Sequence, residues 1–154
     1  MPETTKTRVL SDREFAIEHT FHAPAAKVFA AYTDPKIVPL WWAPPGGTIA
    51  VEKMDVRPGG SYRFLQRAFG QEMVFIGRYL EVSPVTRLVY TFAVEGQGDE
   101  VTTTVELTER EGVTHGVMVN RFVSKQAHDT AVKYGAEGGA RAAWDQLEKV
   151  LGSR

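Results

Sequence analysis

Histidines are the side chains of this sequence that could bind a metal ion or transfer a proton near neutral pH. There are four: His19, His22, His115 and His128. His19 and His22 have a spacing seen among metal ligands, but a strand places residues three apart on opposite faces. No pair of acidic residues completes the set at a suitable spacing. We therefore expect no metal site, no cofactor and no catalytic residue among them.

His19 has a further property, because it interrupts an apolar series. Phe15, Ile17 and Phe21 alternate with polar residues, which predicts a strand whose buried face includes His19. A buried histidine is commonly a hydrogen-bonded structural residue, and the alternative is that it contacts a bound ligand. The sequence leaves both interpretations open, so His19 is a candidate ligand-binding residue.

Other polar side chains give no recognisable catalytic group. The chain has no cysteine, and its serines occur in turn or cap contexts rather than between a strand and a helix, where a hydrolase nucleophile would stand. Gln66, His115, Asn120 and Arg121 fall on strand-like segments whose alternation is ambiguous, so which way the last three face is left open. An inward Arg or His could orient a carboxylate or a carbonyl group of a ligand.

Composition limits the class of protein. The 154 residues include 18 Lys+Arg and 19 Asp+Glu, a formal net charge of −1, and 43% are hydrophobic. A near-neutral chain lacks the basic footprint of a nucleic-acid-binding protein, and the absence of cysteine excludes disulfides and thiolate-bound metals. No apolar run approaches the roughly 18 residues of a membrane span. No apolar signal core begins the sequence, so we expect a cytoplasmic protein.

Alternation of apolar and polar residues predicts that most of the chain forms a β-sheet. After the strand around Phe15, six strand-like segments follow with short turns between them. They are residues 48–56, 61–67, 72–82, 87–94, 100–109 and 113–122. The alternation of strands with helices that a parallel sheet requires is absent. We expect a single α+β domain at residues 11–152, with a bent antiparallel sheet of seven strands, after a flexible tail at residues 1–10.

Helical periodicity appears in two places. Residues 25–32 are amphipathic and follow Pro24, and Asp34-Pro35 starts a second short helix. A longer helical stripe occupies the end of the chain. A shift in its phase at residues 135–139 predicts a short helix, a break and then a long terminal helix.

The stripe of the terminal helix changes in size along its length. Its first half presents Ala136, Gly139, Ala140 and Ala143, and larger residues begin at Trp144. Normal packing density would require bulk along the whole stripe. The small half therefore predicts a ligand cavity beside Ala140, bounded by Trp144. The alternative is that the small residues allow close contact between helix and sheet.

Aromatic and methionine side chains would line such a cavity. The candidates besides His19, Ala140 and Trp144 are Trp41, Trp42, Tyr62, Phe64, Phe75, Tyr79, Tyr90, Phe92 and Met118. Aromatic residues at strand spacing also fill ordinary cores, so each could instead be a packing residue.

Five segments, in order and at suitable distances, resemble a known family. They read FHAPAAKVFAAYTDP, LWWAPPGG, MDVRPGGSYRF, GRYLEVSPVTRLVYTF and EGGARAAWDQLEKVL, and they extend over nearly all of the domain. The chain resembles homologues of the activator of heat-shock-protein-90 ATPase, in the START-like, SRPBCC superfamily. The resemblance implies the helix-grip fold, in which a bent sheet and the terminal helix enclose an elongated apolar cavity and two short helices close one end.

The resemblance leaves three functions to compare. The first is binding of a small apolar or amphipathic molecule, lipid-like or polyketide-like, in the cavity. The second is a protein-interaction module like a co-chaperone, although the chain has no room for a separate chaperone-binding domain, so chaperone binding is not expected. The third is a cyclase or dehydratase, which would need an inward acid–base pair. Exposed edge strands would also allow a homodimer. Binding without catalysis is the function that the sequence favours.

Overall fold

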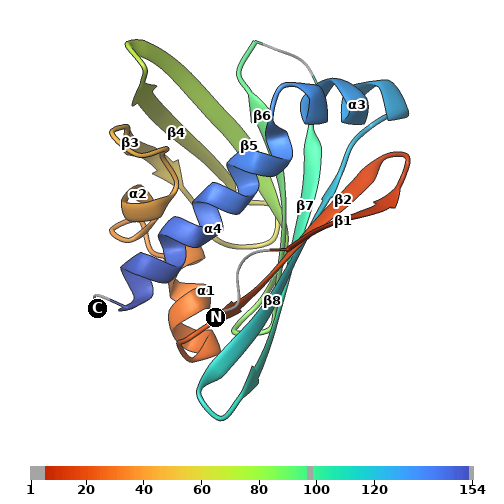
Figure 1. Cartoon of the computed structure of the whole chain (residues 1–154). Helices are drawn as coiled ribbons and strands as arrows, with labels where there is room; N and C mark the ends of the chain where they lie inside the picture. The colour runs from red at the N-terminus through yellow and green to blue at the C-terminus, as the bar shows by residue number, and fades with distance from the viewer. Residues whose placement is uncertain (1–5, 97–98, 153–154) are drawn as a thin grey trace.

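The chain folds into one antiparallel sheet that curves around a long helix (Figure 1). The computed structural model describes residues 6–96 and 99–152. The strands are β1 (Lys6–Ser11), β2 (Glu14–Phe21), β3 (Thr48–Met54), β4 (Ser61–Ala68), β5 (Gln71–Ser83), β6 (Arg87–Val94), β7 (Val101–Arg110) and β8 (Val113–Arg121). The helices are α1 (Ala25–Thr33), α2 (Val38–Trp41), α3 (Lys125–Lys133) and α4 (Ala136–Gly152).

The sheet has eight strands, in the order β1-β2-β8-β7-β6-β5-β4-β3. After β2 the chain crosses through α1 and α2 to the far edge, and β3 to β8 then return by consecutive antiparallel pairing. Register shifts occur between Tyr79 and Glu81 of β5 and between Val51 and Lys53 of β3. Such irregularities bend a strand, which accords with a sheet that wraps a helix rather than lying flat.

The first strand corrects two predictions. The sheet has eight strands and not seven, because residues 6–10 of the expected tail form, with Ser11, a strand that pairs with β2, from Lys6 opposite Glu18 to Ser11 opposite Glu14. Residues 1–5 of that tail lie outside the described part. Most of β1 is exposed, so its side chains show no burial alternation. Its structure comes from backbone pairing and from contacts such as the Arg8–Glu18 ion pair, which leave no periodic signal in the sequence.

The two C-terminal helices are separated where the phase shift predicted. The Ser124 side chain caps α3 by accepting a hydrogen bond from the Ala127 amide at 3.0 Å. Gly135 has a φ of 93° between α3 and α4, a conformation that favours glycine. The break between the short and the long helix is therefore confirmed.

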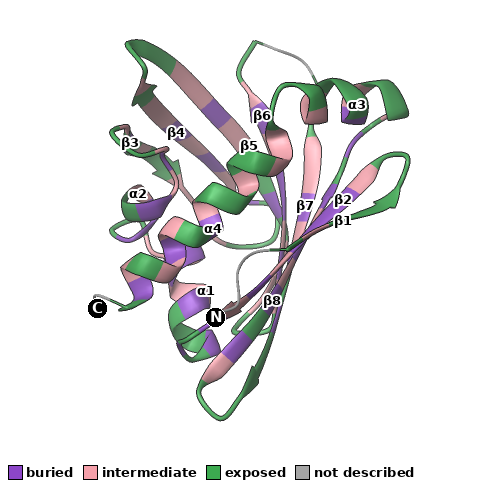
Figure 2. Ribbon diagram, viewed as in Figure 1, coloured by how far each residue is buried: buried purple, intermediate pink, exposed green. Residues whose placement is uncertain are grey.

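Helix α4 is held to the sheet mainly by its C-terminal half. Trp144, Leu147 and Leu151 are its buried residues, and Figure 2 shows the same change from exposed to buried along the helix. The Trp144 indole N–H donates a 2.7 Å hydrogen bond to the Tyr32 hydroxyl of α1. Gly116 of β8 lies directly beneath the Trp144 ring, where a β-carbon would come within 3.2 Å of it. This half of α4 is thus packed against the sheet, whereas the half with small residues has no buried side chain.

Candidate functional site

A cavity of about 480 Å³ lies between the N-terminal half of α4, the sheet and the segment after α2. The α4 wall consists of Ala136, Gly139, Ala140, Ala142, Ala143 and Gln146. Except for Gln146 these side chains are absent or a single methyl group, so they leave the space that a normal core would fill. The unfilled volume predicted from the small residues of the terminal helix is present in the structure.

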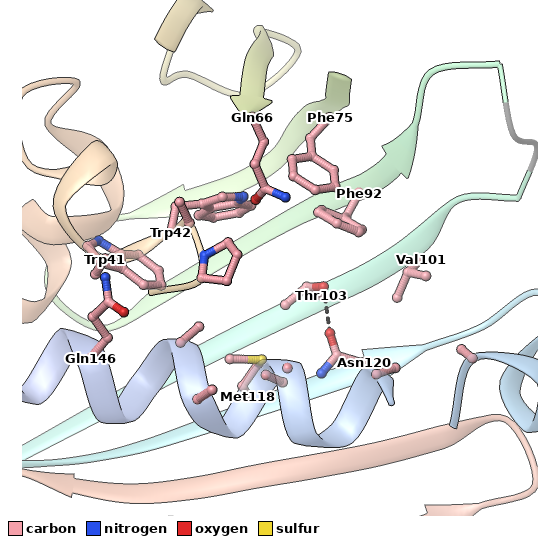
Figure 3. A pocket seen from close by; sticks show the side chains of 18 of the residues that line it. Trp41, Trp42, Gln66, Phe75, Phe92, Val101, Thr103, Met118, Asn120 and Gln146 are labelled. Atoms are coloured by element: carbon pink, nitrogen blue, oxygen red, sulfur yellow. Dashed lines mark hydrogen bonds between the residues drawn. The ribbon is translucent and has the colours of Figure 1, made fainter. Parts of the chain in front are cut away.

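Aromatic residues supply the opposite walls of the cavity. Phe75 of β5 and Phe92 of β6 stack with ring centroids 5.0 Å apart, and Tyr90 lies further along β6. Trp41 and Trp42 come from the end of α2 and both contribute to the lining (Figure 3). The Trp41 indole N–H donates to the Ala31 carbonyl oxygen at 2.9 Å, which fixes that ring. These five aromatic residues were predicted to line a cavity, and the structure places them there.

The chain connecting α2 to β3 completes this side. Ala43, Pro44 and Pro45 line the cavity directly after the two tryptophans. Pro45 is exposed, as are Gly139 and Ala142 on α4. The lining therefore reaches solvent between the proline pair and the first turns of α4.

Three predicted lining residues lie outside this cavity. Tyr62, Phe64 and Tyr79 form an adjoining cluster, in which the Tyr62 ring is 4.8 Å from Phe64 and 5.5 Å from Tyr79. The Tyr62 hydroxyl donates to the Thr91 carbonyl oxygen at 2.6 Å. The hollow beside this cluster measures about 10 Å³, room for at most one water. The prediction is corrected here: these rings are core, because the Trp42 ring packs 5.3 Å from Phe64 and 6.4 Å from Tyr62, and Tyr79 packs on Tyr62.

Trp144 and His19 also lie outside the lining. Trp144 follows the small residues of α4 and is fully buried, with its ring edge-on to that of Phe21 at a centroid distance of 5.0 Å. His19 is 4% exposed and its Nε2 lies 2.7 Å from Oε1 of Glu148, on the C-terminal half of α4. The same carboxylate accepts the backbone N–H of His22 at 3.1 Å. His19 therefore fastens β2 to α4, and the structural interpretation replaces the ligand-contact one.

Besides its tyrosines, the cavity is lined by four residues that carry a side-chain amide or hydroxyl group: Gln66, Thr103, Asn120 and Gln146. Met118 and Asn120 are the residues of β8 that line the cavity, with Thr103 beside Asn120 on β7. The Thr103 hydroxyl donates to Asn120 Oδ1 at 2.9 Å. Gln66 comes from β4, and Gln146 of α4 donates to the Leu40 carbonyl oxygen at 3.0 Å. Of the residues predicted to bind a ligand, the structure places in the lining Met118, Ala140 and the five aromatic residues named above.

The strand register settles the side chains whose facing was open. Asn120 and Gln66 face the cavity, whereas His115 is half exposed and lies 3.3 Å from Glu18 on the other face. Arg121 is exposed as well. The sequence could not decide this because β8 alternates buried and half-buried residues that include polar ones on both faces.

Several lining residues were not predicted. Phe15, Phe122 and Ala131 close the end of the cavity near α3, and Tyr32 closes the end near α1. Each belongs to an apolar pattern that was recognised. Their positions relative to the cavity depend on how α1 and α3 dock against the sheet, which periodicity does not encode.

The electrostatic character of the cavity is neutral. No Asp, Glu, Lys, Arg or His is among its lining residues in the described part of the chain. Tyr32 and Tyr90 are its ionisable groups, and burial raises the pKa of both phenols far above the usual value. Both are therefore uncharged hydrogen-bonding groups at neutral pH, and neither can act as a base there.

A family model described as "Activator of Hsp90 ATPase homolog 1-like protein" matches residues 22–152. The chain belongs to this family. The resemblance given by the five sequence segments is therefore confirmed, and so is the α+β helix-grip class apart from the strand count. A comparison with curated proteins gave no match.

Solved structures share the fold over almost the whole chain. A protein from Rhodobacter sphaeroides is 21% identical with a TM-score of 0.90, covering 99% of this chain and 100% of its own. One from Mycobacterium smegmatis is 22% identical with a TM-score of 0.85, covering 97% and 96%. One from Chromobacterium violaceum is 24% identical with a TM-score of 0.79, covering 92% and 98%. At these identities the likeness concerns the fold.

The described residues contain neither a metal-binding cluster nor a membrane-spanning helix. Among residues 6–96 and 99–152, no group of three or more His, Cys, Asp or Glu side chains could hold a metal ion. None of the described helices is long and apolar enough to span a membrane.

Proposed function

We propose that this protein binds a small apolar or amphipathic molecule in the cavity beneath the N-terminal half of α4. The observation that carries the proposal is the cavity itself, about 480 Å³ in volume and lined mainly by aromatic rings, methyl groups and glycine. Ligand sites of drug-sized molecules typically occupy about 300–1,000 Å³ and combine apolar walls with a few polar groups. Membership of the family is compatible with this function.

The lining favours binding over acid–base catalysis. A cyclase or dehydratase needs a group that takes up a proton near neutral pH. The ionisable lining groups are two phenols whose pKa is raised by burial, and neither will do so. A continuous exposed apolar surface would favour a protein-interaction function. The large apolar residues exposed in the described chain, such as Val9, Phe69 and Tyr134, belong to separate elements and turns, so no observation favours that alternative.

The test is to fill the cavity from α4. Ala140→Trp places an indole among the small residues of the lining, and we expect it to weaken binding of the neutral fluorescent probe N-phenyl-1-naphthylamine by about tenfold or more. Probe fluorescence measures the affinity, and circular dichroism verifies that the fold is retained.

A matched control separates loss of the cavity from the cost of adding a large residue to α4. Arg141 is exposed and does not line the cavity, so Arg141→Trp should bind the probe as the unmodified protein does. Equal affinity of a folded Ala140→Trp variant would exclude this cavity as the binding site. Native mass spectrometry of the protein purified from its own host would then identify any natural ligand that remains bound.

A further inference from the structure

Asn120 stands at an unusual place in the sheet. Its row of paired residues runs from Phe15 on β2 through Asn120 on β8 and Thr103 on β7 to Tyr90 on β6. The neighbouring inward row, centred on Met118 of β8, is apolar at each of the same strands. It consists of Ile17, Met118, Val105 and Leu88. An amide at the centre of the inward face therefore replaces a residue that packing alone would make apolar.

Only one of the two polar atoms of the Asn120 amide has a hydrogen-bond partner. Its Oδ1 accepts from the Thr103 hydroxyl at 2.9 Å, while Nδ2 is buried and has no hydrogen-bond partner in the structure. A buried donor without a partner is costly, so most such groups in proteins are paired. The residue is 91% buried, being 9% exposed, and it lines the cavity. Nδ2 itself has almost no exposed surface, so a bound molecule supplies the missing partner when the amide turns slightly toward the cavity that Asn120 lines.

Two other buried polar side-chain atoms of the described chain have no hydrogen-bond partner, Thr7 Oγ1 on the edge strand β1 and His128 Nε2, and neither residue lines the cavity. The His128 ring lies 5.5 Å from Phe122 and 6.3 Å from Phe15, two residues of the cavity wall. Of these three residues, Asn120 is the one that lines the cavity.

The amide is also held in one orientation. Asn120 and Thr103 are directly paired residues of β8 and β7, in the middle of the sheet. Because the Thr103 hydroxyl occupies Oδ1, the two N–H groups of Nδ2 are left as donors. Figure 3 shows the pair facing the cavity, on the opposite side from Gln66 and Phe75 in this view. A side chain restrained in this way loses little freedom when a ligand binds.

We propose that Asn120, oriented by Thr103, donates a hydrogen bond to a carbonyl oxygen of the bound molecule, so that the cavity selects neutral apolar compounds that carry a ketone, ester or amide. The choice of a neutral ligand follows from the lining, which offers no cation to a carboxylate and no anion to an amine. The choice of an acceptor follows from the free donor at Nδ2. This inference rests on the proposed function and adds the chemical class of its ligand.

Three probes of similar size and shape separate these properties. They are 2-acetylnaphthalene, which carries a ketone, 2-isopropenylnaphthalene, its hydrocarbon counterpart, and 2-naphthoate, which carries a charge. Isothermal titration calorimetry should give the ketone an affinity about tenfold higher than that of the hydrocarbon, the usual effect of one satisfied buried hydrogen bond. The carboxylate should bind more weakly than the ketone, because its charge would be desolvated without a partner.

Two variants assign the preference to the proposed pair. Asn120→Leu removes the donor at similar volume, and we expect it to abolish the preference for the ketone while the hydrocarbon binds as well or better. Thr103→Val removes only the hydroxyl that holds Asn120, and it should reduce the preference partly. If Asn120→Leu does not fold, Asn120→Met serves instead, since methionine already occupies the equivalent inward position at residue 118.

The outcomes distinguish the two proposals. If none of the three probes binds to the unmodified protein, the proposed binding function fails, and the proposed role of Asn120 fails with it. If the probes bind but the ketone binds no more tightly than the hydrocarbon, the cavity remains a binding site and the proposed hydrogen bond from Asn120 is refuted. The same conclusion follows if Asn120→Leu still prefers the ketone. Tighter binding of the carboxylate than of the ketone would overturn the neutral ligand class.

Discussion

At the scale of single residues, function and packing separate along the long terminal helix. Ala140 and its small neighbours line the cavity, whereas Trp144, one turn later, is fully buried and hydrogen-bonded to Tyr32. The indole reaches the sheet at Gly116, which has no side chain to hold it away. The size of the residue at position 116 therefore sets how closely α4 approaches β8.

Gly116→Ala should destabilise the fold. Its β-carbon would lie 2.9 Å from Cε2 of Phe21 and 3.2 Å from the Trp144 ring, and overpacking of this kind typically costs about 1–3 kcal/mol. Urea unfolding measures the loss. The matched control is Gly138→Ala on α4, where a β-carbon meets nothing within 4 Å. It should stabilise by up to about 1 kcal/mol, because alanine favours the helix. Equal effects of the two variants would contradict the proposed contact.

At the scale of elements, α4 is fastened at one end and open at the other. Its C-terminal half is tied to β2 through Glu148, which bonds the His19 ring and the His22 amide. Its N-terminal half has no fully buried residue and borders the cavity. Because the C-terminal half holds α4 on the sheet, the helix stays in place although the space beneath its N-terminal half is unfilled.

Removing that tie should weaken the whole fold. Glu148→Ala takes away the acceptor that faces buried His19 and the His22 amide, a change that typically costs about 1–3 kcal/mol. Chemical denaturation measures it, with Lys149→Ala as the control. Lys149 is exposed in the same turn, so its replacement should change stability by less than about 0.5 kcal/mol. An unchanged midpoint for Glu148→Ala would show that the carboxylate does not hold β2 to α4.

At the scale of the whole molecule, buried tyrosines join the cavity to the core. Tyr90 lies 6.2 Å from both Tyr32 and Tyr62, and Tyr62 lies 5.5 Å from Tyr79, measured between ring centroids. Burial is the first cause that raises the pKa of each of these four phenols. Their ionisation is therefore coupled to unfolding.

This coupling predicts alkaline instability. The unfolded chain releases phenolic protons near pH 10, while the folded state retains those of Tyr32, Tyr62, Tyr79 and Tyr90 because their pKa is raised. Stability is therefore complete below about pH 10 and falls as the pH rises toward the folded-state pKa. Absorbance at 295 nm should report these four ionisations together with the loss of circular dichroism. Their ionisation at pH 10 in a protein with unchanged circular dichroism would contradict the prediction.

The sequence alone predicted seven of the eight strands, the helices and an unfilled space beside the terminal helix. Alternation in the strands and helical spacing near the C-terminus are local properties, so β2 to β8 and the break at Gly135 could be predicted. The change from small to large residues before Trp144 likewise predicted the cavity beneath α4. Strand β1 could not be predicted, because an exposed edge strand depends on backbone pairing and has little side-chain pattern.

Only the tertiary structure decided which inward residues face the cavity. Phe75 and Tyr62 share the inward face of the sheet, yet Trp42 and α2 cover one of them and leave the other open. Asn120 could be recognised as polar, but its unpaired amide nitrogen became apparent through its pairing with Thr103 on the neighbouring strand β7. The reason is physical. Periodicity determines the face of an element on which a residue lies, while cover and partners depend on how distant elements dock.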